Sequence, residues 1–339
     1  MGSNAYPLGK LPPEHLARLL ADHASSDPRV VLGPGIGRDA AAIDFGDTYV
    51  IAKTDPITFA SDEIGWYAVQ VNGNDIACTG AKPRWFLATL LLPEGQTTPS
   101  LVDTIFDQIA RACRELGATL VGGHTEITYG LDRAIVVGCM LGEVTPERLI
   151  RPGGAQPGDA LLLTKGLAVE GTAIIARELI SRGELEGLDP VLIERSQRFL
   201  YEPGISVVRD ASIATAAGQV HAMHDPTEGG LATGLAELAE TAGVGVAVDE
   251  AALPILPETQ ALCASLELDP LGLIASGALL LAVALEDSIK TVRALEQEGI
   301  PATQIGRVVH SEDGLTLHGP AGKWPLPHFE RDEITRLFE

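Results

Sequence analysis

Aromatic residues, cysteines and basic residues are all scarce in this chain. Only 4% of the 339 residues are aromatic, so we expect cores built from Ala, Leu, Val and Ile. The four cysteines are scattered and form no CxxC pair, which gives no support to a zinc site or a redox dithiol. With 24 basic and 46 acidic residues the formal net charge is -22, and such a field disfavours nucleic acid and anionic membranes as partners. An anionic substrate would have to be met locally by metal, basic side chains or backbone amides.

Long apolar runs are absent as well, and we expect no secretory leader. No apolar run reaches about 18 residues, the length of a membrane span. The start of the chain, MGSNAYPLGKLPPEHL, has no apolar core. We therefore expect a reduced cytoplasmic setting in which the cysteines are small core residues.

The length is sufficient for two domains, and a segment rich in proline and glycine divides the chain. This segment, RPGGAQPGD, spans residues 151–159. Strands and helices are mixed on both sides of it, so the predicted fold class is α+β. The predicted divisions are an arm with a helix at 1–32, a first domain at 33–150, a second at 151–315 and a tail at 316–339.

Periodicity and turn residues predict the individual elements. Strands are predicted at 40–43, 49–53, 85–92, 134–141, 160–165, 244–249, 278–284 and 304–309. Helices are predicted at 63–80, 100–116, 170–182, 190–199, 204–217, 230–241, 257–266 and 285–298. We expect loops at 122–126 and 320–327, and a charged surface helix at 328–339.

The helix predicted over 63–80 carries a carboxylate on its apolar face. Ile64, Ala68, Val71, Asp75 and Cys78 recur at the spacing of one helical face. An ionised Asp facing a core is costly unless something pairs it. Three explanations remain open: a nearby Lys, Arg or backbone donor; a face that is not buried; or a metal ion shared with carboxylates from other elements.

Carboxylates at the ends of other elements favour the metal. Asp39 follows the glycine-rich segment VVLGPGIG at 30–37, and Asp55 follows the strand predicted over 49–53. The sequence GGHTE at 122–126 adds glycines beside a further acid. Hard oxygen ligands together with backbone N–H groups from glycine loops are the parts of a Mg-nucleotide site. Taken singly, each piece is more typical of a turn, a cap or a connecting loop.

The second half contains one comparable stretch, HDPTEGG at 224–230. A helix start with paired glycines can receive a phosphate, and His224 or Asp225 could act on a substrate or reach the metal. The alternative is an ordinary helix start, in which Thr227 is the N-cap and Asp225 makes an Asx turn.

Taken together, five segments resemble the aminoimidazole-ribonucleotide synthetase superfamily over about residues 33–309. They are GRDAAAI at 37–43, KTDPIT at 53–58, VNGNDIACTGAKP at 71–83, GGHTE at 122–126 and HDPTEGGLATGLAELAE at 224–240. The superfamily includes thiamine-monophosphate kinase, selenophosphate synthetase and the hydrogenase maturation protein HypE, and residues 243–250 and 268–280 are most similar to the HypE branch. The resemblance implies a PurM-like fold of two α+β domains, with the first domain binding ATP and Mg and pairing with a second copy into a dimeric β-barrel.

The resemblance also implies site residues by position. Metal ligands would be Asp39, Asp55 and Asp75, and we add the hypothesis that His124 or Asp225 is the general base or substrate contact. Nucleotide and phosphate contacts would be Gly35, Gly37, Arg38, Asn74, Gly122, Gly123, Thr125, Gly229 and Gly230.

Three departures from the family pattern limit which residue roles can be transferred from the family to this chain. Arg38 stands where many relatives have an acid, and His124 suits Mg poorly. The cysteine that ends HypE and is carbamoylated is missing, since the last cysteine here is Cys263.

We therefore expect an ATP-dependent enzyme that activates an oxygen of a separate small substrate by phosphoryl transfer. Two alternatives stay open: a phosphotransferase resembling thiamine-monophosphate kinase, and a non-catalytic nucleotide-binding protein that assembles with a maturation partner.

Overall fold

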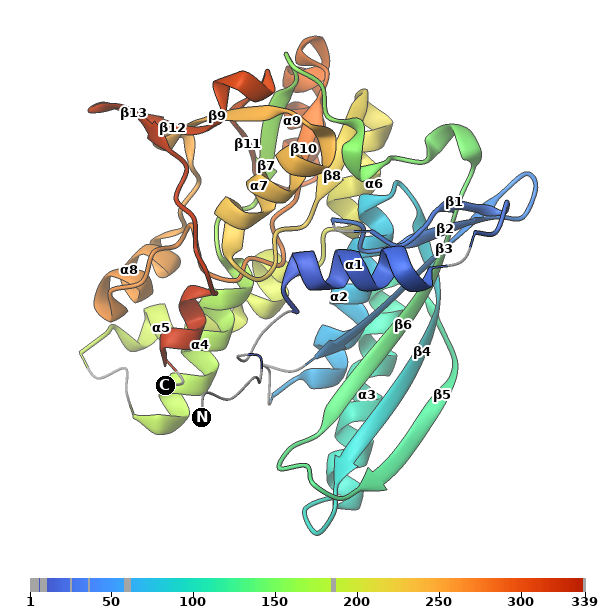
Figure 1. Ribbon diagram of the computed structural model, residues 1–339. Helices are drawn as coiled ribbons and strands as arrows, with labels where there is room; N and C mark the ends of the chain where they lie inside the picture. Colours follow the sequence, from blue (N-terminus) through green and yellow to red (C-terminus); the bar gives the residue numbers. More distant parts are fainter. Residues whose placement is uncertain are drawn as a thin grey trace, which may run out of the picture.

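Two mixed β-sheets, each with its own helices, make up the protein (Figure 1). The computed structural model describes residues 6, 11–24, 26–35, 37–57, 62–183 and 187–337. The predicted α+β fold class is confirmed. Within these residues no helix is both long and apolar enough to cross a membrane.

The first sheet has six strands in the order β1-β2-β3-β6-β4-β5. Its strands are β1 Val30–Leu32, β2 Ala41–Asp44, β3 Tyr49–Ile57, β4 Lys82–Pro93, β5 Thr119–Thr128 and β6 Ile135–Val144. Burial alternates along β6, so the sheet has one face toward a core. Two helices, α2 Ile64–Cys78 and α3 Pro99–Leu116, pack on that face, while α1 Pro13–His23 precedes the sheet.

Helix α2 lies directly against the sheet. Every residue from Ile64 to Ala77 is buried. Two glycines of β6 permit this close approach: a Cβ at Gly138 would lie 2.3 Å from the Asn72 amide, and one at Gly142 would lie 2.3 Å from Ile76. Both contacts are too short for a real side chain, so these glycines fix the position of α2 and of the Asp75 that it carries.

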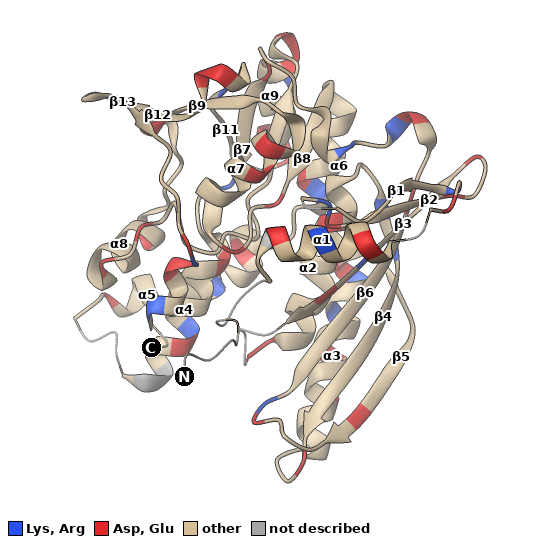
Figure 2. Ribbon diagram, in the orientation of Figure 1, with Lys and Arg blue, Asp and Glu red and all other residues tan. Residues whose placement is uncertain are grey.

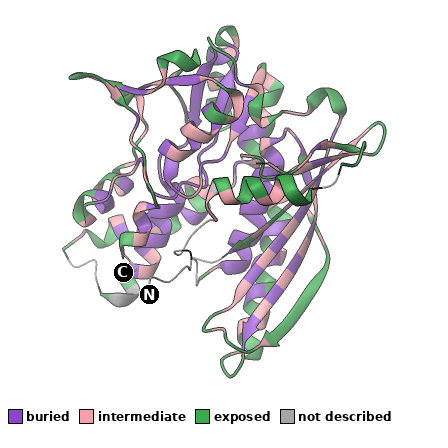
Figure 3. Ribbon diagram, in the orientation of Figure 1, coloured by how far each residue is buried: buried purple, intermediate pink, exposed green. Residues whose placement is uncertain are grey.

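The second sheet has seven strands in the order β13-β12-β9-β11-β7-β10-β8. Strands β7 and β10 are buried throughout, because helices cover both faces of the sheet at its centre (Figure 3). The strands are β7 Ala160–Thr164, β8 Val220–His224, β9 Gly245–Asp249, β10 Leu280–Val283, β11 Ala302–Val309, β12 Leu315–Gly319 and β13 Gly322–Pro325. The helices are α4 Val169–Arg182, α5 Pro190–Arg198, α6 Val208–Ala217, α7 Gly230–Ala242, α8 Pro257–Leu266 and α9 Ser288–Gln297, with a π turn at Leu200–Gly204.

Three predicted segments are wrong. Residues 122–126 form the middle of β5, because the missing side chain of Gly123 lets β5 pair closely with β4; a Cβ there would lie 1.9 Å from the Ala88 carbonyl oxygen. Residues 320–327, expected as a loop, include the β12–β13 hairpin. The expected terminal helix is a short 3₁₀ turn at Glu333–Leu337 with Asp332 and Ile334 buried, and residues 338–339 lie outside the described part.

Candidate functional site

The three predicted metal ligands converge on a lysine. The Lys53 Nζ lies 3.1 Å from an oxygen of Asp75, 3.4 Å from Asp55 and 3.9 Å from Asp39. Lys53 and Asp55 are two residues apart on β3 and share one face of the strand. Asp75 comes from α2, and Asp39 from the turn before β2. Of the three explanations left open for Asp75, the structure shows the nearby lysine.

Burial separates the members of this cluster. Lys53 and Asp75 are 9% and 7% exposed, whereas Asp55 and Asp39 are 40% and 55% exposed. Although burial disfavours the ammonium, the carboxylates, led by Asp75, raise the pKa of Lys53 above its ordinary value. Burial and the neighbouring Asp225 raise the pKa of Asp75, and Lys53 opposes this effect. The cluster therefore joins a buried ion pair to two carboxylates that meet solvent.

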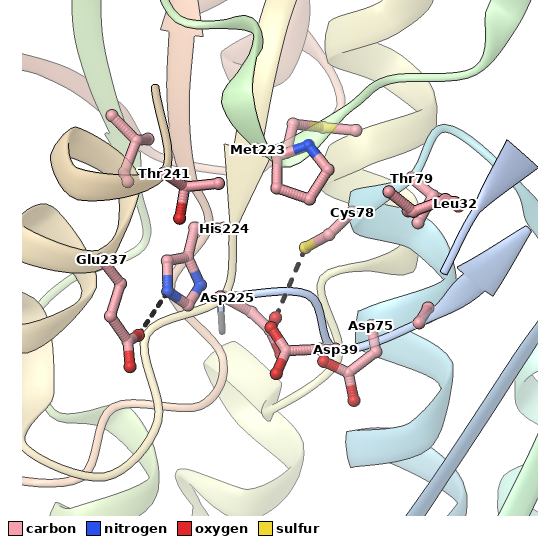
Figure 4. A pocket seen from close by; sticks show the side chains of 14 residues that line it. Leu32, Asp39, Asp75, Cys78, Thr79, Met223, His224, Asp225, Glu237 and Thr241 are labelled. Atoms are coloured by element: carbon pink, nitrogen blue, oxygen red, sulfur yellow. Dashed lines mark hydrogen bonds and ion pairs between the residues drawn. The ribbon is translucent and has the colours of Figure 1, made fainter. Parts of the chain in front are cut away.

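A small cavity lies beside the cluster, between the two sheets (Figure 4). Its volume is about 40 Å³, which is room for water and not for a nucleotide. Asp39 and Asp75 line it from the N-terminal half, and His224, Asp225 and Glu237 from the C-terminal half. The structure thus brings Asp225 to the same cavity as Asp75, although Asp225 lies 150 residues after Asp75 in the chain.

Asp225 is a buried side chain at the cavity with one oxygen free to bind a ligand. One carboxylate oxygen accepts a 3.4 Å hydrogen bond from the Cys78 thiol. The other is buried and has no hydrogen-bond partner among the described residues. Burial is the main cause that raises the pKa of Asp225 to about 6, where a carboxylate can accept a proton near neutral pH.

His224 is held by a carboxylate on the next helix. Its Nε2 lies 2.7 Å from an oxygen of Glu237, on α7. Burial lowers the pKa of His224, but Glu237 more than offsets this and raises it overall. The imidazole is therefore oriented by Glu237, and it lies on the side of the cavity near Asp225 (Figure 4).

As arranged, the carboxylate cluster fits an ammonium ion and not magnesium. The 3.1–3.9 Å separations from Lys53 Nζ are those of ion pairs, whereas Mg²⁺ needs oxygen ligands at about 2.1 Å. Across the described residues, no group of three or more His, Cys, Asp or Glu side chains is placed to hold a metal. Carboxylate oxygens suit a hard cation, but the Lys53 ammonium occupies the place where such a cation would bind.

Asn74, predicted beside the nucleotide, ties the two halves of the molecule together. Its Nδ2 donates to the Ile205 carbonyl and its Oδ1 accepts from the Val207 N–H, both at 2.8 Å. The side chain is fully buried. Both ends of the amide are therefore used by the segment before α6.

The residues predicted at 122–125 lie on another part of the sheet. Strand β5 is three strands away from β3, which is about 14 Å at the usual spacing. His124 is exposed, with its Nε2 3.3 Å from an oxygen of Glu126. Within one chain, Gly122, Gly123, His124 and Thr125 are not brought to the carboxylate cluster.

The helix start at 229–230 is occupied by the chain's own tail. The Gly229 N–H donates a 2.6 Å hydrogen bond to a carboxylate oxygen of Asp332, and the Gly230 N–H donates to the Thr227 carbonyl. The N-cap of α7 is Gly229, so the prediction of Thr227 as N-cap is wrong. Asp332 takes the anion position that the sequence offered to a phosphate.

The glycine-rich segment before β2 reaches the cavity through one residue. Gly37 lines the cavity and contacts α7, since a Cβ there would lie 2.4 Å from the Thr241 hydroxyl. Arg38 is exposed, and its side chain lies beside Gly35. A larger depression of about 1250 Å³ lies elsewhere between the two halves, and none of the predicted site residues lines it.

Comparison with known protein families identifies both parts of the chain. The profile described as AIR synthase related protein, N-terminal domain, matches residues 37–144, and the corresponding C-terminal domain profile matches residues 156–318. The chain belongs to the AIR synthase-related family. The resemblance stated from the sequence is confirmed.

Similarity within the family includes HypE proteins. This family member is 34% identical to the carbamoyl dehydratase HypE of Cupriavidus necator, over 79% of this chain and 72% of that protein. It is 31% identical to HypE of Escherichia coli K12, over 84% and 81%. A crystal structure of HypE in complex with ATP superposes with a TM-score of 0.70 at 25% identity, covering 98% of each chain.

Proposed function

We propose that this protein is a HypE-like, ATP-dependent enzyme that activates an oxygen of a separate small substrate by phosphoryl transfer. The observation that carries the proposal is the convergence of Asp39, Asp55 and Asp75 with Asp225 from the other half of the chain. The curated HypE relatives are named carbamoyl dehydratases, and one HypE structure contains ATP. The structure with ATP supports ATP as the cosubstrate of this chain.

The nucleotide would meet the outer part of the site. Asp39 and Asp55 are solvent-exposed, and Gly35, Gly37 and Arg38 lie at the same end of β2. Arg38 would supply positive charge to a phosphate in a chain that is otherwise strongly acidic. Magnesium, when bound with ATP, would neutralise phosphate charge.

Asp225 is proposed as the proton acceptor for the substrate oxygen. Its unpartnered oxygen offers a hydrogen-bond acceptor, and its raised pKa matches the demands of a general base. His224, held by Glu237, lies next to it and, when protonated, would stabilise the carboxylate form. The buried wall around Cys78 would keep bulk water from this oxygen.

Asp75→Ala should abolish measurable ATP binding in the presence of Mg²⁺. It removes the deepest carboxylate of the cluster and leaves Lys53 to pair with Asp55 and Asp39 alone. Isothermal titration calorimetry measures the affinity. Asp159→Ala is the control, because Asp159 is equally buried, pairs with His221 and lies outside the cavity. Unchanged nucleotide affinity in Asp75→Ala would remove this assignment.

A second candidate is a nucleotide-binding protein without turnover, acting with a maturation-protein partner. The position of Lys53 favours it, because the ammonium already neutralises the carboxylates that an ATP-bound metal would use. Substrate-dependent, multiple-turnover release of phosphate by the purified protein would reject this candidate.

We also propose that the protein is a homodimer formed along β5. This edge strand is exposed along almost its whole length and carries a single acidic residue, Glu126 (Figure 2). Long exposed edges with few charges are templates for pairing with another chain. Such pairing would also place the 122–125 residues against a second copy.

Val121→Lys should convert this dimer to a monomer at micromolar concentration. The Val121 side chain is 52% exposed on β5, and a charge there would be buried by pairing. Sedimentation velocity measures the mass. Val191→Lys is the matched control, because Val191 is 54% exposed on α5. A wild-type monomer, or a Val121→Lys dimer, would contradict the proposal.

A further inference from the structure

We propose that the ammonium of Lys53 is the resident cation of the carboxylate cluster, and that a hard divalent ion such as Mg²⁺ enters only by displacing it. The chain then carries its own competitor for the metal, which keeps metal affinity low in the absence of nucleotide. The inference rests on the proposed function only for the identity of the metal. The competition itself follows from the residues.

The position of Lys53 carries the inference. Its nitrogen lies within 4 Å of carboxylate oxygens on three separate elements, and it is almost fully buried. Among the described residues, Lys53 makes every ion pair recorded for Asp39, Asp55 and Asp75. The ammonium thus stands at the point common to the three carboxylates, where a shared metal would also have to stand.

The charge around Lys53 leaves room for a stronger cation. Three carboxylates face one ammonium, and Asp225 adds a fourth acid close enough to influence Asp75. A dication would neutralise more of this surplus than a single ammonium does. Lysine nonetheless has the advantage of being tethered, because its backbone is part of β3 and its nitrogen never diffuses away from the cluster.

A lysine can also leave this position. Its charge sits at the end of a flexible four-carbon stem. The side chains of Asp39 and Asp55 are partly exposed, so the outer side of the cluster is open to solvent. A displaced ammonium that moves outward would reach the region proposed for the nucleotide phosphates. Binding of a metal with its nucleotide would then be favoured over binding of the metal alone.

The test is a Mn²⁺ titration of the full chain without nucleotide, followed by electron paramagnetic resonance. Lys53→Met should bind one Mn²⁺ at least 10-fold more tightly than the wild type. Lys82→Met, which removes an exposed lysine of β4, should bind Mn²⁺ as the wild type does. Equal Mn²⁺ affinity in Lys53→Met and the wild type would overturn the proposal.

Thermal unfolding gives a second readout. Without metal, Lys53→Met should unfold at a lower temperature than the wild type, because the carboxylates then repel one another. Addition of Mg²⁺ should raise its unfolding temperature by more than it raises that of the wild type. Lys53→Gln, which keeps a hydrogen-bond donor near Asp75, serves if Lys53→Met does not fold. Failure of both variants to fold even with Mn²⁺ would also overturn the proposal, because the ion should replace the ammonium.

The outcome is independent of the proposed enzyme activity. No nucleotide is present in either measurement, so a wild-type protein that fails to bind ATP would sink the proposed function and leave this competition intact. Conversely, tight ATP binding with no effect of Lys53→Met on Mn²⁺ affinity would sink the competition alone.

Discussion

Asp225→Asn is expected to lower ATP-dependent turnover by about 10²–10⁴-fold, the usual contribution of a general base. The substitution keeps the shape of the side chain and the acceptor for the Cys78 thiol. It removes the negative charge and the ability to take up a proton at the oxygen that has no partner. A loss of this size would therefore report on the carboxylate and not on packing.

The pH dependence of the wild type should reveal the same group. A base with a pKa of about 6 is active when deprotonated, so kcat/KM should fall as the pH drops below about 6. In Asp225→Asn this acidic limb should disappear from the residual activity. The measurement is a pH–rate profile of both proteins between pH 5 and 8 at saturating Mg-ATP.

Stability should change in the opposite direction to activity. Folding raises the pKa of Asp225, so its contribution to stability is fully present below about pH 4 and is lost as the pH rises through about 6. The neutral amide avoids this loss, so Asp225→Asn should be at least as stable as the wild type at pH 7 in urea unfolding. This separates the loss of turnover from a loss of folded protein.

Glu170→Gln is the matched control for both experiments. Glu170 is also buried, also has an unpartnered carboxylate oxygen, and has its pKa raised to about 7, first by burial. It does not line the cavity. Equal losses of turnover in Asp225→Asn and Glu170→Gln would remove the special role of Asp225.

Asn74→Ala is expected to lower the free energy of unfolding by about 2–6 kcal/mol. It leaves the Ile205 carbonyl and the Val207 N–H without their partners in a fully buried position, at roughly 1–3 kcal/mol for each group. Because these bonds join α2 to the segment before α6, the loss should be concentrated where the two halves of the molecule meet.

Hydrogen exchange of the Val207 amide measures this local effect. It should accelerate in Asn74→Ala by a larger factor than amides of β7 or β10. Asn72→Ala is the control, since Asn72 is an equally buried asparagine of α2 whose bonds go to Ala68 and Asp55 in its own half. Equal protection of the Val207 amide in all three proteins would show that Asn74 does not hold the two halves together.

The sequence was sufficient to predict that Asp39, Asp55 and Asp75 lie together, whereas their role as metal ligands stays a prediction. The buried face of α2 identified Asp75, and the end of the predicted strand identified Asp55. The motif at 224–230 identified Asp225, and the structure does bring it to the same cavity. A nearby lysine was one of the partners considered for the buried carboxylate of Asp75. Side chains two residues apart on a strand share a face, which places Lys53 on the same face of β3 as Asp55.

Other features depend on contacts that no local pattern encodes. Two glycines in GGHTE look like a loop, yet Gly123 serves a close strand pairing with Ala88. Asp332 caps α7 from a position 103 residues after Gly229, and no residue near Gly229 in the sequence indicates this contact. The amide of Asn74 could have faced a ligand, and only the packing of α6 against α2 shows which partners it has.

The glycines of β6 have a consequence for which parts of the cavity can be altered by substitution. Gly138 and Gly142 admit no side chain beneath α2, so α2 cannot move closer to the sheet. No larger residue fits between α2 and β6, and the cavity wall that carries Asp75 is therefore fixed. We therefore expect that substitutions on the opposite wall, where Met223, His224 and Thr241 come from a separate sheet and helix, change the shape of the cavity most readily. Comparing variants of those three positions is the direct route to changing what the site accepts.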